Sequence, residues 1–216
     1  PRRADGTLFT MSLKRIERFV FLMLLLFVAL ACTSETTMDG NPRLPERAPR
    51  VVVETSLGSF VMGLYEEQSP VTVANFLSYV NAQHFDRTVF HRVIPGFMIQ
   101  GGGFVHQDDR FVRNEVRSPI ILESNNGLKN YRGAVSMART QMPNSASDQF
   151  FVNLDHNQFL DRSGDVEMGY AVFGVVLEGM DVVDAIAAVG THRVAPFPEP
   201  ATPVEDVLIL SVHRQR

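Results

Sequence analysis

The chain has 216 residues, of which 45% are apolar and 20% charged, and its formal net charge is −4. These values suit one globular domain with a sizeable core and exclude a fibrous or wholly disordered protein. Residues 1–31 hold five Lys/Arg against two Asp/Glu, so residues 32–216 carry 15 Lys/Arg against 22 Asp/Glu. This acidic body argues against binding of nucleic acid through a basic surface. The single cysteine excludes an intrachain disulfide framework and every cysteine-rich metal site.

Residues 1–32 have the pattern of an export signal. Three basic residues between positions 14 and 18 precede an uncharged run of 13 apolar residues, Phe19 to Ala31. A bilayer-spanning helix needs about 20 apolar residues, whereas the apolar region of a signal peptide needs roughly 7 to 15. We therefore interpret the run as a signal for export. The residues before Met11 are interpreted as an upstream extension of the reading frame.

The end of this segment, Ala29-Leu30-Ala31-Cys32, resembles the lipobox of bacterial lipoproteins. In that motif, small residues before the cysteine admit the signal peptidase and the thiol receives lipid. The resemblance implies lipidation of Cys32, and Thr33 in the place of an aspartate implies sorting to the outer membrane. We therefore expect a periplasmic, lipid-anchored protein of the bacterial cell envelope. Two alternatives stay open: cleavage after Ala31 to give a soluble secreted protein, or a retained anchor around an incidental buried cysteine.

Residues 33–49 are polar, rich in turn-forming residues and almost free of large apolar side chains. Such a segment cannot bury enough surface to fold by itself. We therefore predict a disordered tether, which would reach at most roughly 56 Å at about 3.3 Å per residue. The folded domain is expected to span residues 50–216.

The domain begins with two β-rich runs, Val51 to Thr55 and Phe60 to Tyr65, and the turn-forming residues 56–59 between them predict a hairpin. An amphipathic helix is expected next, because Ser69-Pro70 supplies a cap residue and a proline for the first turn. Its apolar positions follow i, i+3, i+4, i+7 spacing: Val73, Phe76, Leu77 and Val80.

Short strands and a second helix fill the rest of the domain. The strands are predicted at Thr88 to Val93, Phe97 to Gln100, Ile120 to Leu122, Ala134 to Ala138, Phe150 to Leu154, Ala171 to Val176 and Val207 to Val212. The second helix is expected over Met180 to Val189, and the proline-rich residues 190–206 predict a surface connection. Many short strands with only two helices indicate a closed β-barrel, because closure leaves no sheet edge unpaired.

The domain lacks the motifs of metal and covalent catalysis. Its histidines show no H-E-x-x-H or other pairing at metal-ligand spacing, so we expect no metal site. No G-x-S-x-G nucleophile elbow is present, and Cys32 lies outside the domain, so nucleophilic catalysis has no obvious agent. The triplet Gly101-Gly102-Gly103 lacks the Lys-Ser/Thr and the helix of a phosphate loop. It predicts a bend or bulge where the backbone needs freedom.

Four sequence blocks resemble those of a known family. The stretch FHRVIPGFMIQGG at residues 90–102 resembles the signature of the cyclophilins, which are peptidyl-prolyl cis-trans isomerases. The segment MARTQ at 137–141, followed by SASDQFF at 145–151, resembles the next cyclophilin motif in its bacterial form. Two further blocks, NQFL at 157–160 and YAVFG at 170–174, follow in family order. The resemblance implies a mainly β fold, a closed eight-stranded antiparallel barrel capped by two α-helices.

The resemblance also implies a set of site residues. Arg92 corresponds to the catalytic arginine, with Phe97 and Gln100 beside it. The implied substrate-binding residues are Met98, Ala138, Arg139, Gln149, Phe151, Phe159, Leu160 and Tyr170. The aromatic and aliphatic members would form the wall of a proline pocket, the two glutamines would orient the arginine and the substrate, and the backbone at Ala138 and Arg139 would contact the peptide.

Several of these residues have a structural alternative. On composition alone the aromatic side chains would be core residues, and strand alternation does not say which of them face an outer groove. We assign Phe150 and Phe173 to the core and leave Tyr170 open between pocket rim and structural role. Phe159 replaces a tryptophan and Tyr170 a histidine of the animal pattern, as in bacterial cyclophilins. The first replacement implies weak cyclosporin binding.

The chemistry of proline isomerisation suits these residue types. Because no atom is transferred, the reaction needs no nucleophile and no cofactor, and an arginine can donate a charge-assisted hydrogen bond to the proline nitrogen in the twisted state. We therefore expect an isomerase that acts on proline-containing polypeptides during folding in the cell envelope. It is expected to be a monomer, to bind no nucleic acid, and to meet a membrane only through its N-terminal lipid. A proline-peptide binding module with incidental isomerase activity is the alternative.

Overall fold

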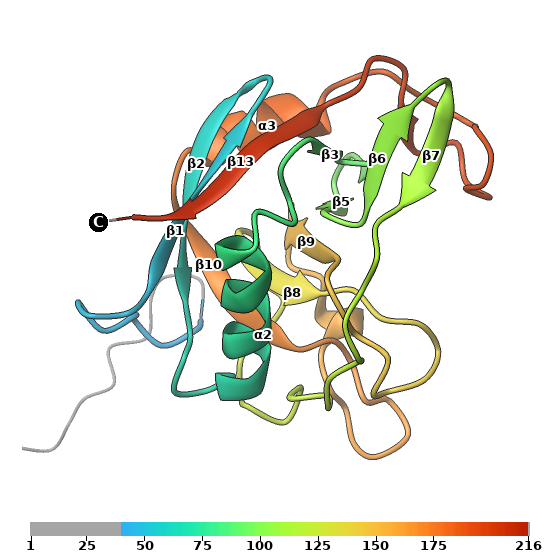
Figure 1. Cartoon of the computed structure of the whole chain (residues 1–216). Coiled ribbons are helices and arrows are strands. Elements are labelled where there is room, and N and C mark those ends of the chain that lie inside the picture. The colour runs from blue at the N-terminus through green and yellow to red at the C-terminus, as the bar shows by residue number, and fades with distance from the viewer. Residues whose placement is uncertain (1–39, 216) are drawn as a thin grey trace, which may run out of the picture. The chain divides into compact units, whose positions relative to one another are not determined.

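Strands of the domain build one large curled sheet in the computed structural model, which describes residues 40–215 (Figure 1). Its strands are β1 (Arg50–Thr55), β2 (Gly58–Leu64), β3 (Thr88–Val89), β4 (Arg92–Ile94), β5 (Met98–Gly101), β8 (Ala134–Met137), β9 (Phe150–Asn153), β10 (Val172–Glu178) and β13 (Leu208–Arg214). The strands pair in the order β3-β13-β1-β2-β10-β8-β9-β5-β4. The strands that carry predicted site residues, β4, β5 and β9, are therefore neighbours at one end of the sheet.

The sheet is open, so the predicted closed eight-stranded barrel is wrong, although the mainly β fold with two helices is confirmed. The edge strands β3 and β4 are consecutive pieces of one chain segment, separated only by Phe90 and His91. Because the chain runs directly from one into the other, these two strands cannot pair side by side. The segment bonds instead to the C-terminal part of the chain: Phe90 N–H donates to the Val207 carbonyl at 3.0 Å. The sheet therefore has nine strands and curls without closing.

Two helices pack against the sheet, α2 (Pro70–Asn81) and α3 (Met180–Ala187), in agreement with the prediction. Ser69 occupies the N-cap position of α2, but its hydroxyl donates to the Val172 carbonyl at 2.8 Å instead of capping the helix. Glu123 from a distant loop does this, because its carboxylate accepts from the backbone N–H groups of Val71 at 3.1 Å and Thr72 at 2.7 Å. The sequence thus predicts where the helix begins but not the group that caps it.

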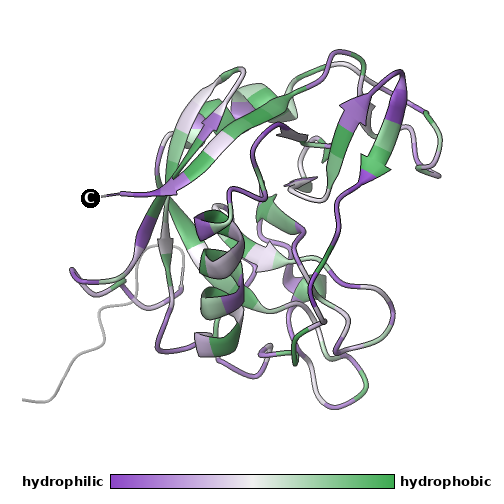
Figure 2. Cartoon of the chain, in the orientation of Figure 1, coloured by the Kyte–Doolittle hydropathy of each residue, from purple (hydrophilic) through white to green (hydrophobic). Residues whose placement is uncertain are grey.

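The main core joins both helices to the sheet. The Phe76 ring of α2 lies 5.1 Å from the Phe173 ring and 5.6 Å from the Phe150 ring, and all three side chains are buried. Val183 and Ile186 of α3 belong to the same cluster. The strands β8 and β9 are buried along their whole length, and Figure 2 shows β9 as predominantly hydrophobic. The assignment of Phe150 and Phe173 to the core is confirmed.

Two short strand pairs lie outside the main sheet. They are β6 (Phe104–Gln107) with β7 (Arg110–Arg113), and β11 (Thr191–His192) with β12 (Thr202–Pro203). The hairpin of β6 and β7 was not predicted, although Asp108 and Asp109 at its turn carry a signal. Both have positive φ, 51° and 56°, which a two-residue hairpin turn requires and aspartate accepts. The strand expected near Ile120 is reduced to a single bridge between Ile120 and Ala146.

Residues 40–49, which the sequence analysis places in the tether, lie against the domain. Asn41 and Lys129 exchange two hydrogen bonds: the Asn41 amide donates to the Lys129 carbonyl at 2.9 Å, and the Lys129 N–H donates to Asn41 Oδ1 at 2.7 Å. The Tyr65 hydroxyl donates to the Pro42 carbonyl at 3.0 Å. Hydrogen bonds thus join residues 41 and 42 of this polar segment to the domain, and the tether over residues 33–49 stays a prediction.

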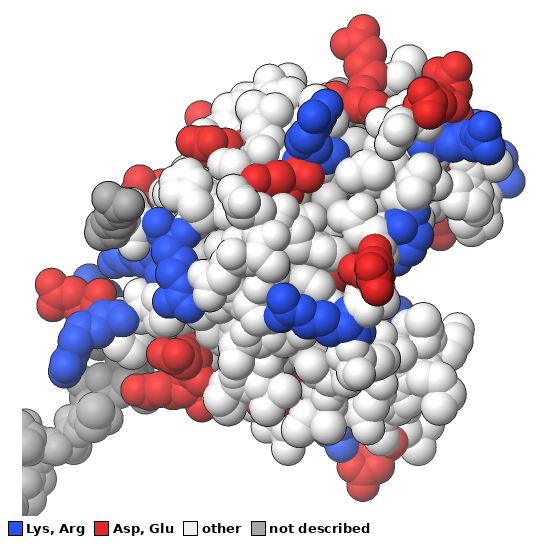
Figure 3. Space-filling view, viewed as in Figure 1, with Lys and Arg blue, Asp and Glu red and all other residues white. Residues whose placement is uncertain are grey.

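The predicted export signal, Cys32 and the rest of the tether lie outside the described residues. Between residues 40 and 215, no helix has both the length and the hydropathy needed to cross a bilayer. On the face shown in Figure 3, basic and acidic side chains are interspersed rather than gathered by sign.

Candidate active site

Three neighbouring strands bring residues that are far apart in the sequence into one row. Arg92 of β4 faces Gln100 of β5, and Gln100 faces Phe151 of β9. Directly opposed residues point to the same face of a sheet, so these three side chains lie side by side. Met98, two residues before Gln100, joins them on that face. The pairing of β4, β5 and β9 therefore assembles the centre of the predicted site.

The Arg92 side chain is partly exposed and is held at two of its nitrogens. Nε donates to Glu199 Oε2 at 2.8 Å, and Nη1 lies 3.8 Å from Met98 Sδ. The guanidinium carbon lies 5.8 Å from the centre of the Phe97 ring, within the range of a cation–π contact. The hydrogen bond from Arg92 lowers the pKa of Glu199 and keeps its carboxylate charged. Arg92 is thus held with one end of its guanidinium beside apolar side chains.

This end of Arg92 borders a small cavity of about 150 Å³. Its lining residues are Arg92, Phe97, Met98, Gln100, Ala138, Arg139, Phe151, Leu160 and Tyr170. Met98, Phe151 and Leu160 form a buried apolar cluster of their own, separate from the main core. A cavity of roughly 150 Å³ can hold benzene, and the pyrrolidine ring of proline is smaller than benzene. The cavity is therefore large enough to receive a proline ring.

The far wall of the cavity is built by loop residues that pack on β9. Leu160 ends the short 3-10 helix η1 (Gln158–Leu160), and its carbonyl accepts from the Tyr170 N–H at 2.9 Å. The Tyr170 ring meets the Phe151 ring edge-on at 5.6 Å, and the Arg139 guanidinium lies 4.6 Å from the Tyr170 ring centre. Tyr170 thus both lines the cavity and packs on its neighbours.

Two glutamines connect the cavity to the loop before β9. Gln100 Nε2 donates to Gln149 Oε1 at 2.8 Å. The Gln149 side chain lies directly on Gly103, where any Cβ would clash with it. Gly102 has a φ of +89°, which glycine adopts at little cost. The glycine triplet therefore supplies the predicted backbone freedom at Gly102 and a close approach for Gln149 at Gly103.

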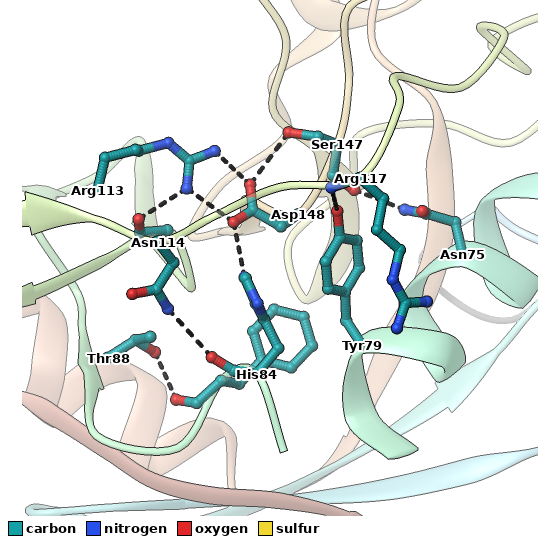
Figure 4. Close-up of polar contacts among 11 residues, drawn as sticks. Asn75, Tyr79, His84, Thr88, Arg113, Asn114, Arg117, Ser147 and Asp148 are labelled. Carbon is teal, nitrogen blue, oxygen red and sulfur yellow. Dashed lines mark hydrogen bonds and ion pairs between the residues drawn. The ribbon is translucent and has the colours of Figure 1, made fainter. Parts of the chain in front are cut away.

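Asp148, the residue before Gln149, is the centre of a buried ionic cluster (Figure 4). Its carboxylate accepts from Arg113 Nη2 at 2.5 Å and Nη1 at 2.7 Å, and His84 Nε2 lies 2.8 Å from Oδ2. Arg113 belongs to β7 and His84 to the loop after α2. The cluster therefore ties the β6–β7 hairpin and the end of α2 to the segment that carries Gln149.

The electrostatics of this cluster favour a charged carboxylate. Burial by itself raises the pKa of Asp148, but the hydrogen bonds and charges of Arg113 and His84 outweigh burial and lower the pKa to about 2. A lowering of the pKa by this amount corresponds to about 2 kcal/mol of stability at neutral pH. The cluster therefore fixes the backbone on which Gln149 is presented to Gln100.

His91, the residue before Arg92, faces an aromatic cluster instead of the cavity. It is 3% exposed, and its ring stacks on Phe197 at 5.1 Å and meets Phe104 at 4.8 Å. Its Nδ1 atom has no hydrogen-bond partner among the described residues. Burial, helped by the positive charges of Arg113 and Arg92, lowers the pKa of His91 to about 4, so the ring is neutral at pH 7.

The structure gathers nearly all the implied site residues around the cavity, with two differences. Phe159 is 73% exposed and does not line the cavity; its ring packs in a tilted arrangement against Phe97, with 5.4 Å between the ring centres. Gln149 bonds to the lining without belonging to it. Two supporting residues were not singled out from the sequence, Asp148 and Glu199. Asp148 lies inside a quoted motif, but Glu199 lies in the stretch interpreted as a surface connection, where no local signal marks it.

A larger cavity, of about 760 Å³, lies beside the N-terminal segment. Asn41, Leu44, Arg50, Tyr65 and Arg132 are among its lining residues, and it contains none of the predicted site residues. Within residues 40–215, no three His, Cys, Asp or Glu side chains are grouped so that they could hold a metal ion. The smaller cavity is the candidate active site, because only there do Arg92, the glutamine pair and an apolar wall converge.

Comparisons with known proteins identify the family of the chain. The family described as cyclophilin type peptidyl-prolyl cis-trans isomerase/CLD matches residues 50–214. Peptidyl-prolyl cis-trans isomerase B of Escherichia coli (strain K12) is 46% identical over 164 residues, which cover 75% of this chain and 97% of that protein. Peptidyl-prolyl cis-trans isomerase A of Dickeya dadantii is 46% identical over 155 residues, which cover 71% of this chain and 80% of that protein.

The fold has a counterpart among solved structures. A cyclophilin type peptidyl-prolyl cis-trans isomerase of Cryptosporidium parvum superposes with a TM-score of 0.61 at 23% identity, covering 78% of this chain and 98% of that one. At this identity the likeness shows the fold alone, whereas the bacterial relatives carry the family assignment. The chain therefore belongs to the cyclophilin-type peptidyl-prolyl cis-trans isomerases, in their bacterial branch, and is an isomerase.

Proposed function

We propose that the protein accelerates the cis–trans isomerisation of X-Pro bonds in polypeptides that fold in the bacterial cell envelope, with Arg92 as the catalytic residue. The observation that carries this proposal is the position of the Arg92 guanidinium at the edge of an apolar cavity that can receive a pyrrolidine ring. A solved Cryptosporidium parvum cyclophilin is described in the presence of the dipeptide Ala-Pro, which supports a proline peptide as the ligand here.

The proposed mechanism follows from the electronic structure of the imide bond. Rotation must break the C–N resonance, which gives a barrier of about 18–20 kcal/mol. In the twisted state the proline nitrogen loses conjugation and gains a basic lone pair, to which the Nη1 end of Arg92 can donate a charge-assisted hydrogen bond. Because this hydrogen bond strengthens as the bond twists, it stabilises the transition state more than the ground state.

Arg92 alone cannot supply a large acceleration. A hydrogen bond to a charged group contributes about 1.5–3 kcal/mol, whereas a 10⁴-fold acceleration requires about 5.5 kcal/mol. The remainder is assigned to the apolar wall of Met98, Phe151 and Leu160, which would hold the ring while the preceding carbonyl rotates and would keep water from the donor. The bonded pair of Gln100 and Gln149 would orient polar groups of the peptide backbone.

Replacing Arg92 tests this mechanism. Arg92→Ala is expected to lower kcat/KM for a proline-containing peptide by about 10- to 100-fold, measured by NMR exchange between the cis and trans forms. Arg92→Lys keeps the charge but loses the planar fork, so its activity should lie between that of the wild type and that of Arg92→Ala. Arg110→Ala, at the exposed tip of the β6–β7 hairpin, is the matched control. Wild-type activity of a folded Arg92→Ala protein would contradict the mechanism.

Peptide binding separates the isomerase from a simple binding module. Phe97→Ala is expected to weaken the binding of a proline peptide, because Phe97 lines the cavity, whereas Arg92→Ala should leave most of the binding in place. If client proteins in the cell need only to be bound, they should fold as well with the Arg92→Ala variant as with the wild type. Loss of client folding in Arg92→Ala, with binding retained, supports catalysis as the function.

The envelope location rests on the sequence of residues 1–32, with its basic and apolar segments and the lipobox-like end at Cys32. We propose lipidation of Cys32 and residence in the periplasm at the outer membrane. Mass spectrometry of the mature N-terminus tests this, because a lipidated protein begins at Cys32 with added acyl mass. A mature chain that begins after Ala31 without lipid would show a soluble exported protein instead.

A further inference from the structure

The candidate catalytic arginine is paired with a carboxylate from a remote loop. Residues 193–201 connect β11 to β12, and these two strands close the base of the loop by pairing with each other. From this loop Glu199 reaches Arg92, 107 residues earlier in the chain, and accepts a hydrogen bond from Nε at 2.8 Å. Among residues 40–215, Glu199 is the one carboxylate within ion-pair distance of Arg92.

The loop is anchored by an aromatic side chain two residues before Glu199. The Phe197 ring stacks on the buried His91 at 5.1 Å, and it meets Phe104 and Phe111 of the β6–β7 hairpin at 5.1 Å each. His91 directly precedes Arg92 in the chain, so the anchor and the ion pair join the same two segments. Figure 1 shows the hairpin beside the orange-to-red connection between α3 and β13.

The ion pair occupies the side of the guanidinium that does not face the cavity lining. Nε is taken by Glu199, whereas Nη1 lies on the Met98 side. An unrestrained arginine side chain has many rotamers, and its donors would be aimed at the cavity only part of the time. An ion pair between partly exposed groups adds little to folding stability. Its effect is therefore expected in the orientation of Arg92 rather than in the stability of the fold.

We infer that Glu199 is a positioning residue for the isomerisation: its carboxylate holds the Nε side of Arg92 so that Nη1 points toward the twisted imide, and Phe197 anchors the loop that delivers it. This inference rests on the proposed role of Arg92. It deepens that role by assigning a function to the connection between β11 and β12, from which Glu199 bonds to the cavity-lining Arg92.

Glu199→Gln, measured beside Glu205→Gln, tests the inference. The Gln variant removes the charge but keeps an acceptor, so kcat should fall by about 1.5- to 5-fold, the range that corresponds to a surface ion pair, while KM stays close to the wild type. Glu205→Gln removes the same charge from an exposed position of the same C-terminal stretch and should leave kcat unchanged. Restored kcat in Glu199→Asp, whose carboxylate is retained, would support the assignment.

Three further measurements distinguish positioning from a structural role. Phe197→Leu leaves Arg92 and Glu199 unchanged and should lower kcat, as Glu199→Gln does. The side-chain Nε–H NMR signal of Arg92 should shift and become more mobile in both Glu199→Gln and Phe197→Leu. In an Arg92→Lys background, which lacks Nε in this geometry, Glu199→Gln should have no further effect on kcat.

Failure of the positioning role can be distinguished from failure of the proposed catalytic role of Arg92. If Arg92→Ala is inactive but Glu199→Gln and Phe197→Leu retain wild-type kcat, the positioning role is overturned and the catalytic role of Arg92 stands. A rise in kcat for Glu199→Gln would also overturn it, because the carboxylate would then compete with the substrate for the arginine. Full activity of Arg92→Ala would remove the proposed mechanism and this inference together.

Discussion

Phe150 and Phe151 are adjacent in β9, and both are almost completely buried, yet they belong to different parts of the molecule. Phe150 is fully buried in the main core with Phe76 and Phe90, whereas Phe151, at 4% exposure, forms the cavity wall with Met98. Burial alone therefore does not separate a residue that stabilises the fold from one that lines the candidate site. The face of the sheet separates them, because successive side chains of a strand point to opposite sides.

The same division holds at two other pairs of neighbours. His91 is buried among aromatic rings while Arg92 borders the cavity, and Asp148 is buried in an ionic cluster while Gln149 bonds to Gln100. In each pair the first residue holds the segment in place and the second one is presented to the site. The cavity is therefore supported by buried residues that directly precede the site residues in the chain.

The largest difference is expected between the two phenylalanines. Phe150→Ala should lower the free energy of unfolding by about 3–5 kcal/mol, because it leaves a cavity in a closed core. Phe151→Ala opens onto an existing hollow that water can enter, so it should cost at most about 2 kcal/mol in stability while lowering kcat/KM about tenfold. Urea unfolding and peptide exchange measured on both variants check this. Equal stability losses would show that the two faces are energetically alike.

The second-largest effect is expected in the free energy of unfolding, which should depend on pH because of His91. Because burial lowers the pKa of His91 to about 4, the unfolded chain, with a pKa of about 6.5, binds a proton between these values that the folded chain does not. Stability should therefore fall as pH drops from about 6.5 to 4, by about 3 kcal/mol. His91→Phe should abolish this slope in urea titrations. His213→Phe, at an exposed position, is the control that should keep it.

The smallest effect is expected at Asp148. Its folded-state pKa of about 2 lies below the usual 3.8, so it contributes about 2 kcal/mol of stability at neutral pH. That contribution should be lost as pH falls from about 4 toward 2. Asp148→Asn should therefore be less stable at pH 7 and show a shallower acid transition by circular dichroism. Gln149→Ala, the neighbouring substitution, should lower activity and leave the acid transition unchanged. A shift of that transition would contradict the separation of a stabilising role for Asp148 from a site role for Gln149.

Local patterns predicted much of the fold. The helices appeared where the spacing of Val73 to Val80 and the Ser69-Pro70 start placed them, and most strands appeared at β-rich runs. The β6–β7 hairpin was missed because its Asp108-Asp109 turn was not recognised as a signal. Barrel closure was mispredicted because strand number does not say which edges can reach each other. Low hydrophobicity alone could not predict the hydrogen bonds of residues 40–49 to the domain, such as the one that Asn41 donates to Lys129.

The sequence by itself determined the order of the elements, the motif that carries Arg92, and the resemblance to an isomerase family. Only the tertiary structure decided which face each side chain occupies, that Glu123 caps α2, and that Glu199 holds Arg92. The physical reason is the range of the interactions. Periodicity, caps and turns depend on residues a few positions apart, whereas a cavity wall or an ion pair across 107 residues exists only after strands and loops have packed together.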